Sequence, residues 1–252
     1  MTRAASTAWL DADWPAPPGV RALTTLRHGL GGSQAPFDAL NLGLRCGDEP
    51  ATVIENRQQL EAALALPSAP RWLHQVHGIE VAIEPGVDEP EADASVTSTP
   101  GTVLAILTAD CLPAIFAAQD GSEIAAAHAG WRGLADGMLE AAVAAMHTPA
   151  DDIVAWLGPC AGSQVYEIGQ EVFDAFVLRD ARAASAFVAT RPGHWRVDLH
   201  ALARQRLANT GIAPNNIYGG GLCTISDPLR FFSHRRDQRS GRMATLVWRE
   251  GS

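Results

Sequence analysis

The sequence predicts an α+β fold, a single domain with a mixed or antiparallel sheet and flanking helices. Three apolar segments, 103–108, 114–118 and 124–128, follow one another too closely for crossover helices to lie between them. Strands and helices are interspersed elsewhere, without the regular alternation of a doubly wound fold. The 252 residues suit one large domain, so residues 1–252 are treated as one unit.

The predicted strands are short apolar or β-branched runs bounded by turn residues. In chain order they are 20–25, 72–77, 94–97, 103–108, 114–118, 124–128 and 153–157. The stretch 84–100 is rich in proline, glycine and acidic residues. We expect it to be a surface excursion within the domain and not a linker between domains.

Four helices are predicted from apolar spacing and end signals. The first has Pro50, which Asp48 precedes, in its first turn and runs to about residue 66, and the second and third cover about 133–146 and 170–178. The fourth has Asp198 as its N-cap and ends at Gly211.

Charge and composition exclude several kinds of function. Acidic residues number 28 against 19 basic ones, a formal charge of -9, which argues against binding to nucleic acid. All 19 basic residues are arginine, so Schiff-base chemistry, a P-loop lysine and a lysine general base are excluded. An anion would be held by arginine, backbone amides or a metal. Genome composition can also produce a lack of lysine, so the lack is no proof of function.

The chain carries no sign of a membrane span or a secretion signal. No stretch approaches the roughly 20 apolar residues that a span needs, and the start through Val20 is interrupted by aspartates and prolines. The cysteines, at 46, 111, 160 and 223, form no CxxC pair and are typical of thiols or metal ligands in a reducing cytoplasm. We expect a cytoplasmic protein that binds small molecules; its oligomeric state is not defined by these patterns.

Residue types that bind metals lie at the ends of three predicted strands. The segments are WLHQVHG at 72–78, TADCLP at 108–113 and AHAGWRG at 127–133. Alternation in a regular strand 72–77 places His74 and His77 on opposite faces, so they would not bind the same atom. Cys111 and His128 can converge with His77. Two histidines and one cysteine suit Zn²⁺, and three protein ligands leave the open position of a catalytic site.

Two other interpretations of these residues remain open on this reasoning. The separations, 34 residues from 77 to 111 and 17 from 111 to 128, match no zinc finger. Cys111 is also consistent with a small buried side chain beside ordinary hydrogen-bonded histidines, and composition alone favours that view. Alternatively, Cys111 is a nucleophile with His128 or His77 as its base.

Four further segments have both a functional and a structural interpretation. Arg132 stands where the second helix begins, so an anion could lie beside it, although an ion pair with a surface carboxylate is the simpler interpretation. Residues 158–162 are expected to end a strand, and the Cys160 side chain is expected only to pack against its neighbours. Residues 231–237 either line a phosphate site or form a solvated turn. The glycines at 29–32 lack the GK[ST] of a P-loop.

Taken together, HQVHG at 74–78, TADCLP at 108–113 and HAGWRG at 128–133 resemble the laccase-domain proteins, the YfiH-type family first labelled multicopper polyphenol oxidases. Supporting matches run almost end to end, over roughly 21–248, and include LNLG at 40–43, GPC at 158–160 and FSHRR at 232–236. The loop between Thr25 and Ser33 departs from the family pattern, as though a residue or two were inserted.

The resemblance implies a single α+β domain with an active-site zinc held by His77, Cys111 and His128. Copper is a metal that such a site could take in vitro. The resemblance also implies phosphorolysis of adenosine, inosine and methylthioadenosine, an adenosine deaminase activity and a link to editing of peptidoglycan precursors. A true laccase is disfavoured, because no HxH pair occurs among the eight histidines.

We therefore expect a zinc-dependent purine nucleoside phosphorylase. By position, Asp110 beside Cys111 is a candidate to orient that ligand or act as general acid. Arg132 and Arg57 are candidates for binding the anion, and Asn41 and Gln75 for ribose or base. The alternatives are a Cys-based amidase, with Cys111 as nucleophile, that edits peptidoglycan precursor peptides, and a metal-binding interaction domain with weak incidental activity.

Overall fold

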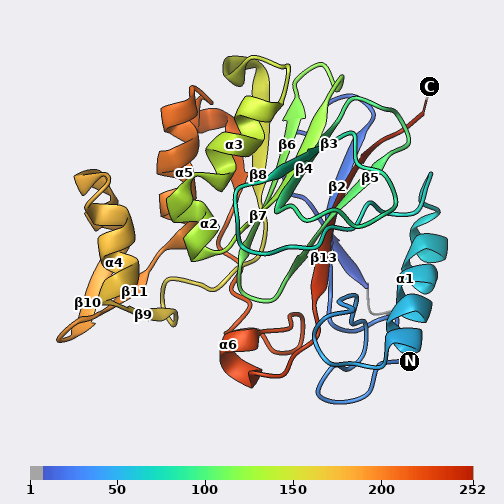
Figure 1. Cartoon of the computed structure of the whole chain (residues 1–252), viewed down its shortest axis with the longest axis horizontal. Helices are drawn as coiled ribbons and strands as arrows, with labels where there is room; N and C mark the ends of the chain where they lie inside the picture. The colour runs from blue at the N-terminus through green and yellow to red at the C-terminus, as the bar shows by residue number, and fades with distance from the viewer. Residues whose placement is uncertain (1–7, 252) are drawn as a thin grey trace, which may run out of the picture.

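Two β-sheets stacked face to face form the centre of the structure, a computed structural model that describes residues 8–251 (Figure 1). Residues 1–7, which begin the segment predicted to lack a signal peptide, and residue 252 lie outside the described residues. Antiparallel and mixed sheets are combined with helices, so the predicted α+β class is confirmed.

The first sheet has four strands, each antiparallel to its neighbours. Across the sheet they are β1 (Trp9–Asp11), β2 (Val20–Thr25), β13 (Met243–Arg249) and β5 (Val103–Thr108). The register pairs Thr24 with Thr245, and their buried hydroxyls form a 2.7 Å hydrogen bond. The last strand of the chain therefore lies between β2 and β5 and joins the two halves of this sheet.

The second sheet has six strands and is mixed. Across the sheet they are β12 (Ile217–Gly219), β8 (Ile153–Leu157), β6 (Leu112–Ala118), β7 (Ile124–Ala129), β4 (Ala94–Thr97) and β3 (Val81–Ile83). The outer pairs β12–β8 and β3–β4 are parallel, and the inner pairs are antiparallel. The central strands β6 and β7 are buried along their whole length.

The three successive strands that predict the fold class belong to two different sheets. β5 lies in the four-stranded sheet, whereas β6 and β7 pair in the six-stranded sheet. Leu104 and Ile106 of β5 pack between the sheets against Ile115 and Ala117 of β6. Residues 109–111 therefore carry the chain from one sheet to the other.

Helices cover the outer faces of both sheets, which completes four layers (Figure 1). On the six-stranded sheet lie α2 (Trp131–Asp136), α3 (Met138–Ala145) and α5 (Leu199–Thr210). On the four-stranded sheet, α1 (Pro50–Leu64) inserts Leu60 among Leu23 and Leu246. Apolar side chains on both faces of each sheet are thus removed from water.

The helix predictions are confirmed at the first, third and fourth helices and corrected at the second. Asp198 caps α5 by accepting a 2.9 Å hydrogen bond from the Ala201 N–H, and Gly211 ends the helix. The single helix predicted for 133–146 is wrong, because Gly137, at φ 108°, separates α2 from α3. α1 starts at Pro50, in agreement with the prediction of Pro50 in its first turn.

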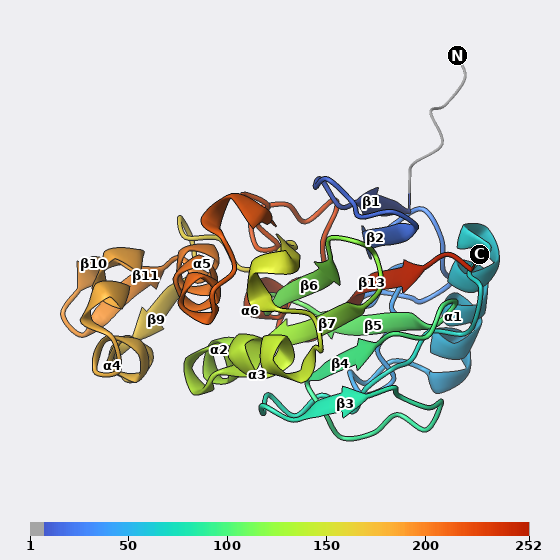
Figure 2. The same ribbon diagram turned by 90° about the horizontal axis from the view of Figure 1, so that it is seen from above.

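The strand predicted at 72–77 is wrong. This stretch has only isolated bridges, at its flank from Arg71 to Leu104 and within it from His74 to Glu91. Several elements had no prediction, β13 among them. At one end of the molecule, β9 (Glu167–Gly169), β10 (Phe187–Arg191) and β11 (His194–Val197) form a small sheet beside α4 (Gln170–Val177) (Figure 2).

The other short elements are 3-10 helices and one helical turn. They are Ala150–Asp152, Ala181–Ala186, Pro214–Asn216 and α6 (His234–Asp237). Within residues 8–251, no helix combines the length and the apolar character needed to cross a membrane.

Glu123, in the turn between β6 and β7, ties this turn to the segment after α3. Its buried carboxylate accepts hydrogen bonds from the backbone N–H groups of His147 and Thr148, both 3.0 Å, and from the Thr148 hydroxyl at 2.7 Å. Burial by itself raises the pKa of Glu123, but these hydrogen bonds hold that pKa below its ordinary value.

We expect Glu123→Gln to lower the free energy of unfolding by about 1–3 kcal/mol at pH 7, because an amide NH₂ group would face N–H donors. A carboxyl with a depressed folded pKa stabilises the fold above its unfolded pKa, and this contribution is lost as pH falls through the folded pKa. The difference between the two proteins should therefore shrink below about pH 4. Urea unfolding across this pH range measures it, and a pH-independent difference would contradict the prediction.

Candidate metal centre

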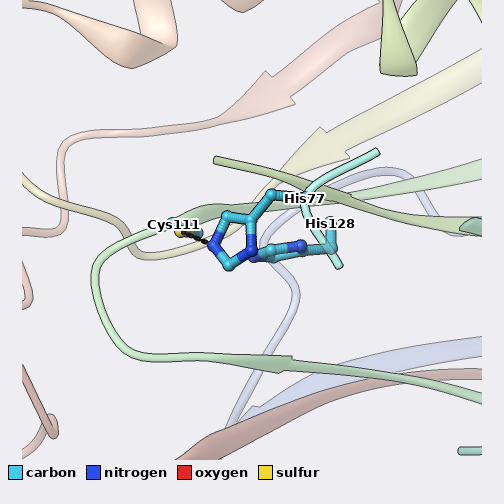
Figure 3. Close-up of side chains that lie close together, drawn as sticks. All are labelled: His77, Cys111 and His128. Atoms are coloured by element: carbon cyan, nitrogen blue, oxygen red, sulfur yellow. Dashed lines mark hydrogen bonds between the residues drawn. The ribbon is translucent and has the colours of Figure 1, made fainter. Parts of the chain in front are cut away.

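His77, Cys111 and His128 meet at one end of the sheet pair (Figure 3). Their ligand atoms all lie within 4.8 Å of one another, and His77 Nε2 is 3.7 Å from Cys111 Sγ. The two imidazole rings are edge to face, with centroids 4.7 Å apart. His128 is buried, Cys111 is half-buried and His77 is exposed, so the group is open to solvent on one side.

The position of each residue follows from the topology. Cys111 ends the passage between the two sheets and directly precedes β6. His128 lies near the end of β7, opposite Pro113 of β6, which brings it to the same edge as Cys111. His77 comes from the irregular loop before β3 and has a left-handed backbone, with φ 64°. His74 faces elsewhere and pairs with Glu91, with 3.8 Å between Nδ1 and Oε2.

Asp93 is a buried carboxylate behind the two histidines. Its Oδ1 atom accepts hydrogen bonds from His128 Nδ1 at 2.8 Å and from the His77 N–H at 3.0 Å. Its Oδ2 atom accepts from the N–H groups of Gly78 and Val76, at 2.7 and 3.1 Å. Burial by itself raises the pKa of Asp93, but His128 and the loop N–H groups hold that pKa below its usual value.

Asp110 is a second buried carboxylate, beside Cys111. Its two oxygens accept hydrogen bonds from the hydroxyls of Thr224 and Ser233, at 2.6 and 3.0 Å, and from the Arg235 N–H at 2.6 Å. These contacts tie two C-terminal loops to the loop that carries Cys111. They favour the orienting role predicted for Asp110 over that of a general acid.

The ligand group favours a thiolate. Removal from water by itself raises the pKa of the Cys111 thiol, but the charges and hydrogen bonds of His128 and His77 lower it to about 6. Burial lowers the pKa of His128, whereas the Cys111 thiolate and Asp93 raise it, to about 9. The thiolate is the form of cysteine that binds metals and acts as a nucleophile.

These residues fit a zinc ion. With bonds of about 2.3 Å to sulfur and 2.0–2.1 Å to imidazole, a tetrahedral angle separates the two ligand atoms by about 3.6 Å. The 3.7 Å between Cys111 Sγ and His77 Nε2 is close to that value. His128 already donates from Nδ1 to Asp93, the hydrogen bond that orients most metal-binding histidines.

Two cavities meet at His77 and Cys111, which line both. The larger has a volume of about 360 Å³ and is walled by leucines such as Leu73 and Leu107, together with several polar side chains. The smaller has a volume of about 90 Å³ and includes Arg132. The candidate centre therefore has a roomy side and a narrow side.

Arg132 lines the smaller cavity and Gln75 the larger one, and they differ in how far their polar groups are already hydrogen-bonded within the protein. Arg132 is exposed, belongs to the first turn of α2 and stacks on the Trp131 ring, with its guanidinium carbon 4.5 Å from the ring centroid. Gln75 lines the larger cavity, but its amide donates to the Leu107 carbonyl and accepts from the Leu107 N–H, both at 2.8 Å. Arg132 is thus the more available of the two for a ligand.

Asn41 and Arg57, predicted to bind substrate or anion, are both buried and hydrogen-bonded within the protein. Asn41 is fully buried; it accepts from the N–H groups of Gly43 and Arg242, at 3.0 and 2.8 Å, and donates to Asp48 at 2.9 Å. Arg57 is buried against the Trp72 ring and donates to the Leu42 carbonyl and to Glu89. The polar groups of both residues are thus bonded within the protein, and their roles in binding substrate or anion stay predictions.

Three other segments singled out in the sequence, at 29–32, 158–162 and 231–237, also make contacts within the protein. The glycine loop packs on α1, where the Gly32 N–H donates to Asn56 at 2.8 Å. Cys160 is buried, with Sγ 3.6 Å from His200 Nε2, and forms an isolated backbone bridge with Cys223. In residues 231–237, Ser233 caps α6 and the Arg236 guanidinium donates to backbone carbonyls.

Residues 21–250 match the model of the family described as multi-copper polyphenol oxidoreductase laccase. A protein from Xylella fastidiosa (strain Temecula1), named purine nucleoside phosphorylase, is 62% identical over 250 residues, which cover 95% of this chain and 96% of that one. The chain belongs to this laccase-domain family. Its other relatives include purine nucleoside phosphorylase YfiH of Escherichia coli K12, 49% identical over 93% of this chain and 96% of that protein.

The laccase-domain fold is also found in a solved structure. The crystal structure of Neisseria meningitidis protein NMB0706 superposes with a TM-score of 0.92 at 44% identity, covering 97% of this chain and all of that chain. The relatives and this structure match nearly the full length of the chain, which includes the segments that carry the candidate centre.

In this laccase-domain protein, sequence reasoning missed Asp93 and the contacts of Thr224 and Ser233 with Asp110. Asp93 lies among several other acidic residues of the excursion at 84–100, and composition alone does not distinguish it from them. Its one local signal is its place directly before the apolar segment 94–97. Thr224 and Ser233 become neighbours of Asp110 only through the fold.

Gly130 leaves room for the ligand group. A Cβ atom built on it would lie 2.8 Å from His77 Cδ2 and 3.0 Å from Cys111 Sγ. Its φ of -62° is acceptable for alanine, so the added methyl group, and not the backbone, causes the conflict.

We expect Gly130→Ala to weaken zinc binding by about tenfold or more, since two ligands must shift. The loss of a good N-cap should cost only about 1 kcal/mol of stability. Competition with a chromophoric chelator measures the affinity. Gly32→Ala is the matched control, because a Cβ there meets nothing within 4 Å. Equal zinc affinity in both variants would contradict the expected steric effect.

Proposed function

We propose that this chain is a zinc-dependent purine nucleoside phosphorylase that acts on adenosine, inosine and methylthioadenosine. The observation that carries the proposal is a metal-type ligand group at the junction of two cavities, in a chain whose full-length relatives are named purine nucleoside phosphorylases. The proposed metal ligands are His77, Cys111 and His128. The products are the free base and ribose 1-phosphate, or its methylthio analogue.

The two cavities suggest where the two substrates bind. The larger one has apolar walls for a purine and polar groups, including Arg242 and His234, at its edge. The smaller one has the volume for an ion the size of phosphate and includes Arg132. Because the chain lacks lysine, arginine is its permanently charged group for phosphate. We assign the nucleoside to the larger cavity and phosphate to the smaller one.

In the proposed reaction, phosphate approaches the anomeric carbon of the nucleoside from the side opposite the base, as an in-line displacement requires. A phosphate oxygen forms a bond to that carbon while the bond to the base nitrogen breaks, and the base leaves with the electron pair and takes up a proton. Arg132 orients the phosphate and offsets its charge. The bound zinc would supply Lewis-acid stabilisation or activate water, and the latter would account for an adenosine deaminase side activity.

A Cys-based amidase that edits peptidoglycan precursor peptides is the second candidate function. The observation in its favour is the Cys111 thiol, whose pKa is lowered to about 6 beside His77 and His128. Covalent trapping of Cys111 in metal-free, active protein would support the amidase. Stoichiometric zinc that is lost in Cys111→Ala would count against it.

We also propose that the protein works on small molecules in the cytoplasm, without nucleic-acid or membrane partners. The negative net charge and the four free cysteines support this proposal.

Zinc-loaded protein should release hypoxanthine from inosine only when phosphate is present, with ribose 1-phosphate formed in equal amount. Chromatographic separation of base and sugar phosphate measures both products. Base release that is independent of phosphate would indicate hydrolysis. The absence of any base release would refute the proposed phosphorylase.

Arg132→Gln should raise the KM for phosphate by about tenfold or more, because one charge-assisted contact of about 1.5–3 kcal/mol is lost. The KM for inosine should change little, since the nucleoside is assigned to the other cavity. Initial rates at varied phosphate and inosine separate the two constants. Arg182→Gln, at an exposed arginine that pairs with Asp180, is the control. An unchanged phosphate KM would contradict the assignment of Arg132.

A further inference from the structure

The Asp93 carboxylate connects two of the three candidate ligands through a single buried group. It is fully removed from solvent and accepts four hydrogen bonds, one from the His128 ring and three from consecutive backbone N–H groups, those of Val76, His77 and Gly78. Its own carbonyl accepts a 2.7 Å hydrogen bond from the His128 N–H. Asp93 therefore contacts both the side chain and the backbone of His128.

The contact with His128 selects one form of the imidazole ring. Nδ1 lies 2.8 Å from Asp93 Oδ1, and a carboxylate only accepts hydrogen bonds, so Nδ1 carries the proton. In a neutral ring, Nε2 then has the free lone pair, which makes it the ligand atom of His128. The carboxylate also raises the electron density of the ring and makes Nε2 a stronger donor to a cation.

The contacts with residues 76–78 hold the second histidine in place. His77 has φ 64°, in the left-handed region that non-glycine residues rarely adopt. The two Asp93 oxygens receive the N–H groups on both sides of this residue, as well as its own. These hydrogen bonds offset the cost of the unusual backbone, and they aim the His77 ring at Cys111.

We propose that Asp93 is the positioning residue of the metal centre, which sets the ring form of His128 and the loop conformation of His77 together. The inference rests on the proposed metal centre and goes beyond it by assigning the group that arranges its ligands. The proposal predicts that the site is largely arranged before the ion binds, because the hydrogen bonds of Asp93 lie entirely within the protein.

The first test uses the unaltered protein. In a ¹⁵N-histidine NMR experiment on zinc-loaded protein, His128 should show a protonated Nδ1 and a metal-shifted Nε2. His128→Gln assigns the resonance. A His128 ring that is protonated at Nε2 and bound through Nδ1 would overturn the proposal without any substitution at Asp93.

The second test compares Asp93→Asn with Glu123→Gln. An asparagine has one acceptor and one donor end, so its NH₂ group must face either His128 Nδ1–H or the loop N–H groups. We expect zinc affinity to fall about 10–100-fold, as is typical of such partners of metal-binding histidines. Cobalt substituted for zinc should show shifted d–d absorption bands, which report the ligand geometry directly.

Glu123→Gln is the matched control, since Glu123 is also a buried carboxylate that accepts backbone N–H groups but lies away from the centre. Its zinc affinity and cobalt spectrum should equal those of the wild type. If Asp93→Asn binds zinc as tightly and with the same spectrum, Asp93 is not the positioning residue. If the wild type itself binds no stoichiometric zinc, the metal centre and the proposed function fail first. If Asp93→Asn does not fold, the NMR experiment decides.

Discussion

The structure depends on a three-residue passage between two sheets. β5 ends at Thr108 in the four-stranded sheet and β6 begins at Leu112 in the six-stranded sheet, so residues 109–111 must change both direction and sheet. Asp110 accommodates the turn with a φ of 94°. The passage places Cys111 at the edge where the two sheets meet. Because β7 pairs with β6, it also brings His128 to that edge.

Buried carboxylates stabilise the segments around this passage. Asp110 accepts hydrogen bonds from Thr224, Ser233 and Arg235 and fixes the C-terminal loops against Cys111. Asp93 accepts hydrogen bonds from the His77 N–H and from His128 Nδ1 and so fixes both histidines. A buried charge is costly unless it is hydrogen-bonded or paired, and here backbone N–H groups, two hydroxyls and one imidazole provide the compensation. Two buried carboxylates, Asp93 and Asp110, therefore fix the segments around the candidate centre, while His77 and Cys111 line the two cavities.

Several arginines, the only basic residues apart from histidine, use their guanidinium groups for hydrogen bonds within the protein. Arg57 is buried, where removal from water lowers its pKa, although its hydrogen bond and ion pair with Glu89 raise it; it also stacks on Trp72. Arg236 donates to three backbone carbonyls. Such contacts use the planar guanidinium and its several donors, which an ammonium group does not have. Arg57 and Arg236 thus bond to the protein itself, whereas Arg132 lines a cavity.

Much of the fold follows from local patterns. The strands at 20–25, 94–97, 103–108 and 153–157 lie where apolar and β-branched runs predict them, and α5 starts and stops at the cap residues Asp198 and Gly211. The substrate roles of Asn41 and Arg57 stay predictions; the structure shows their polar groups bonded within the protein, and nearness to a motif does not define which way a polar side chain points. β13 was overlooked, although Met243–Arg249 carries an apolar run as clear as that of the predicted strands.

The sequence by itself determined the α+β class, the cap residues and the three side chains that could bind a metal. These depend on local propensity and residue chemistry, which act over a few neighbouring positions. Only the tertiary structure decided that β5 and β6 lie in different sheets and that His77 lies in a loop and not in a strand. It alone also put Asp93 behind both histidines. These outcomes depend on which faces are buried against each other by residues far apart in the chain, and local patterns carry no information about that choice.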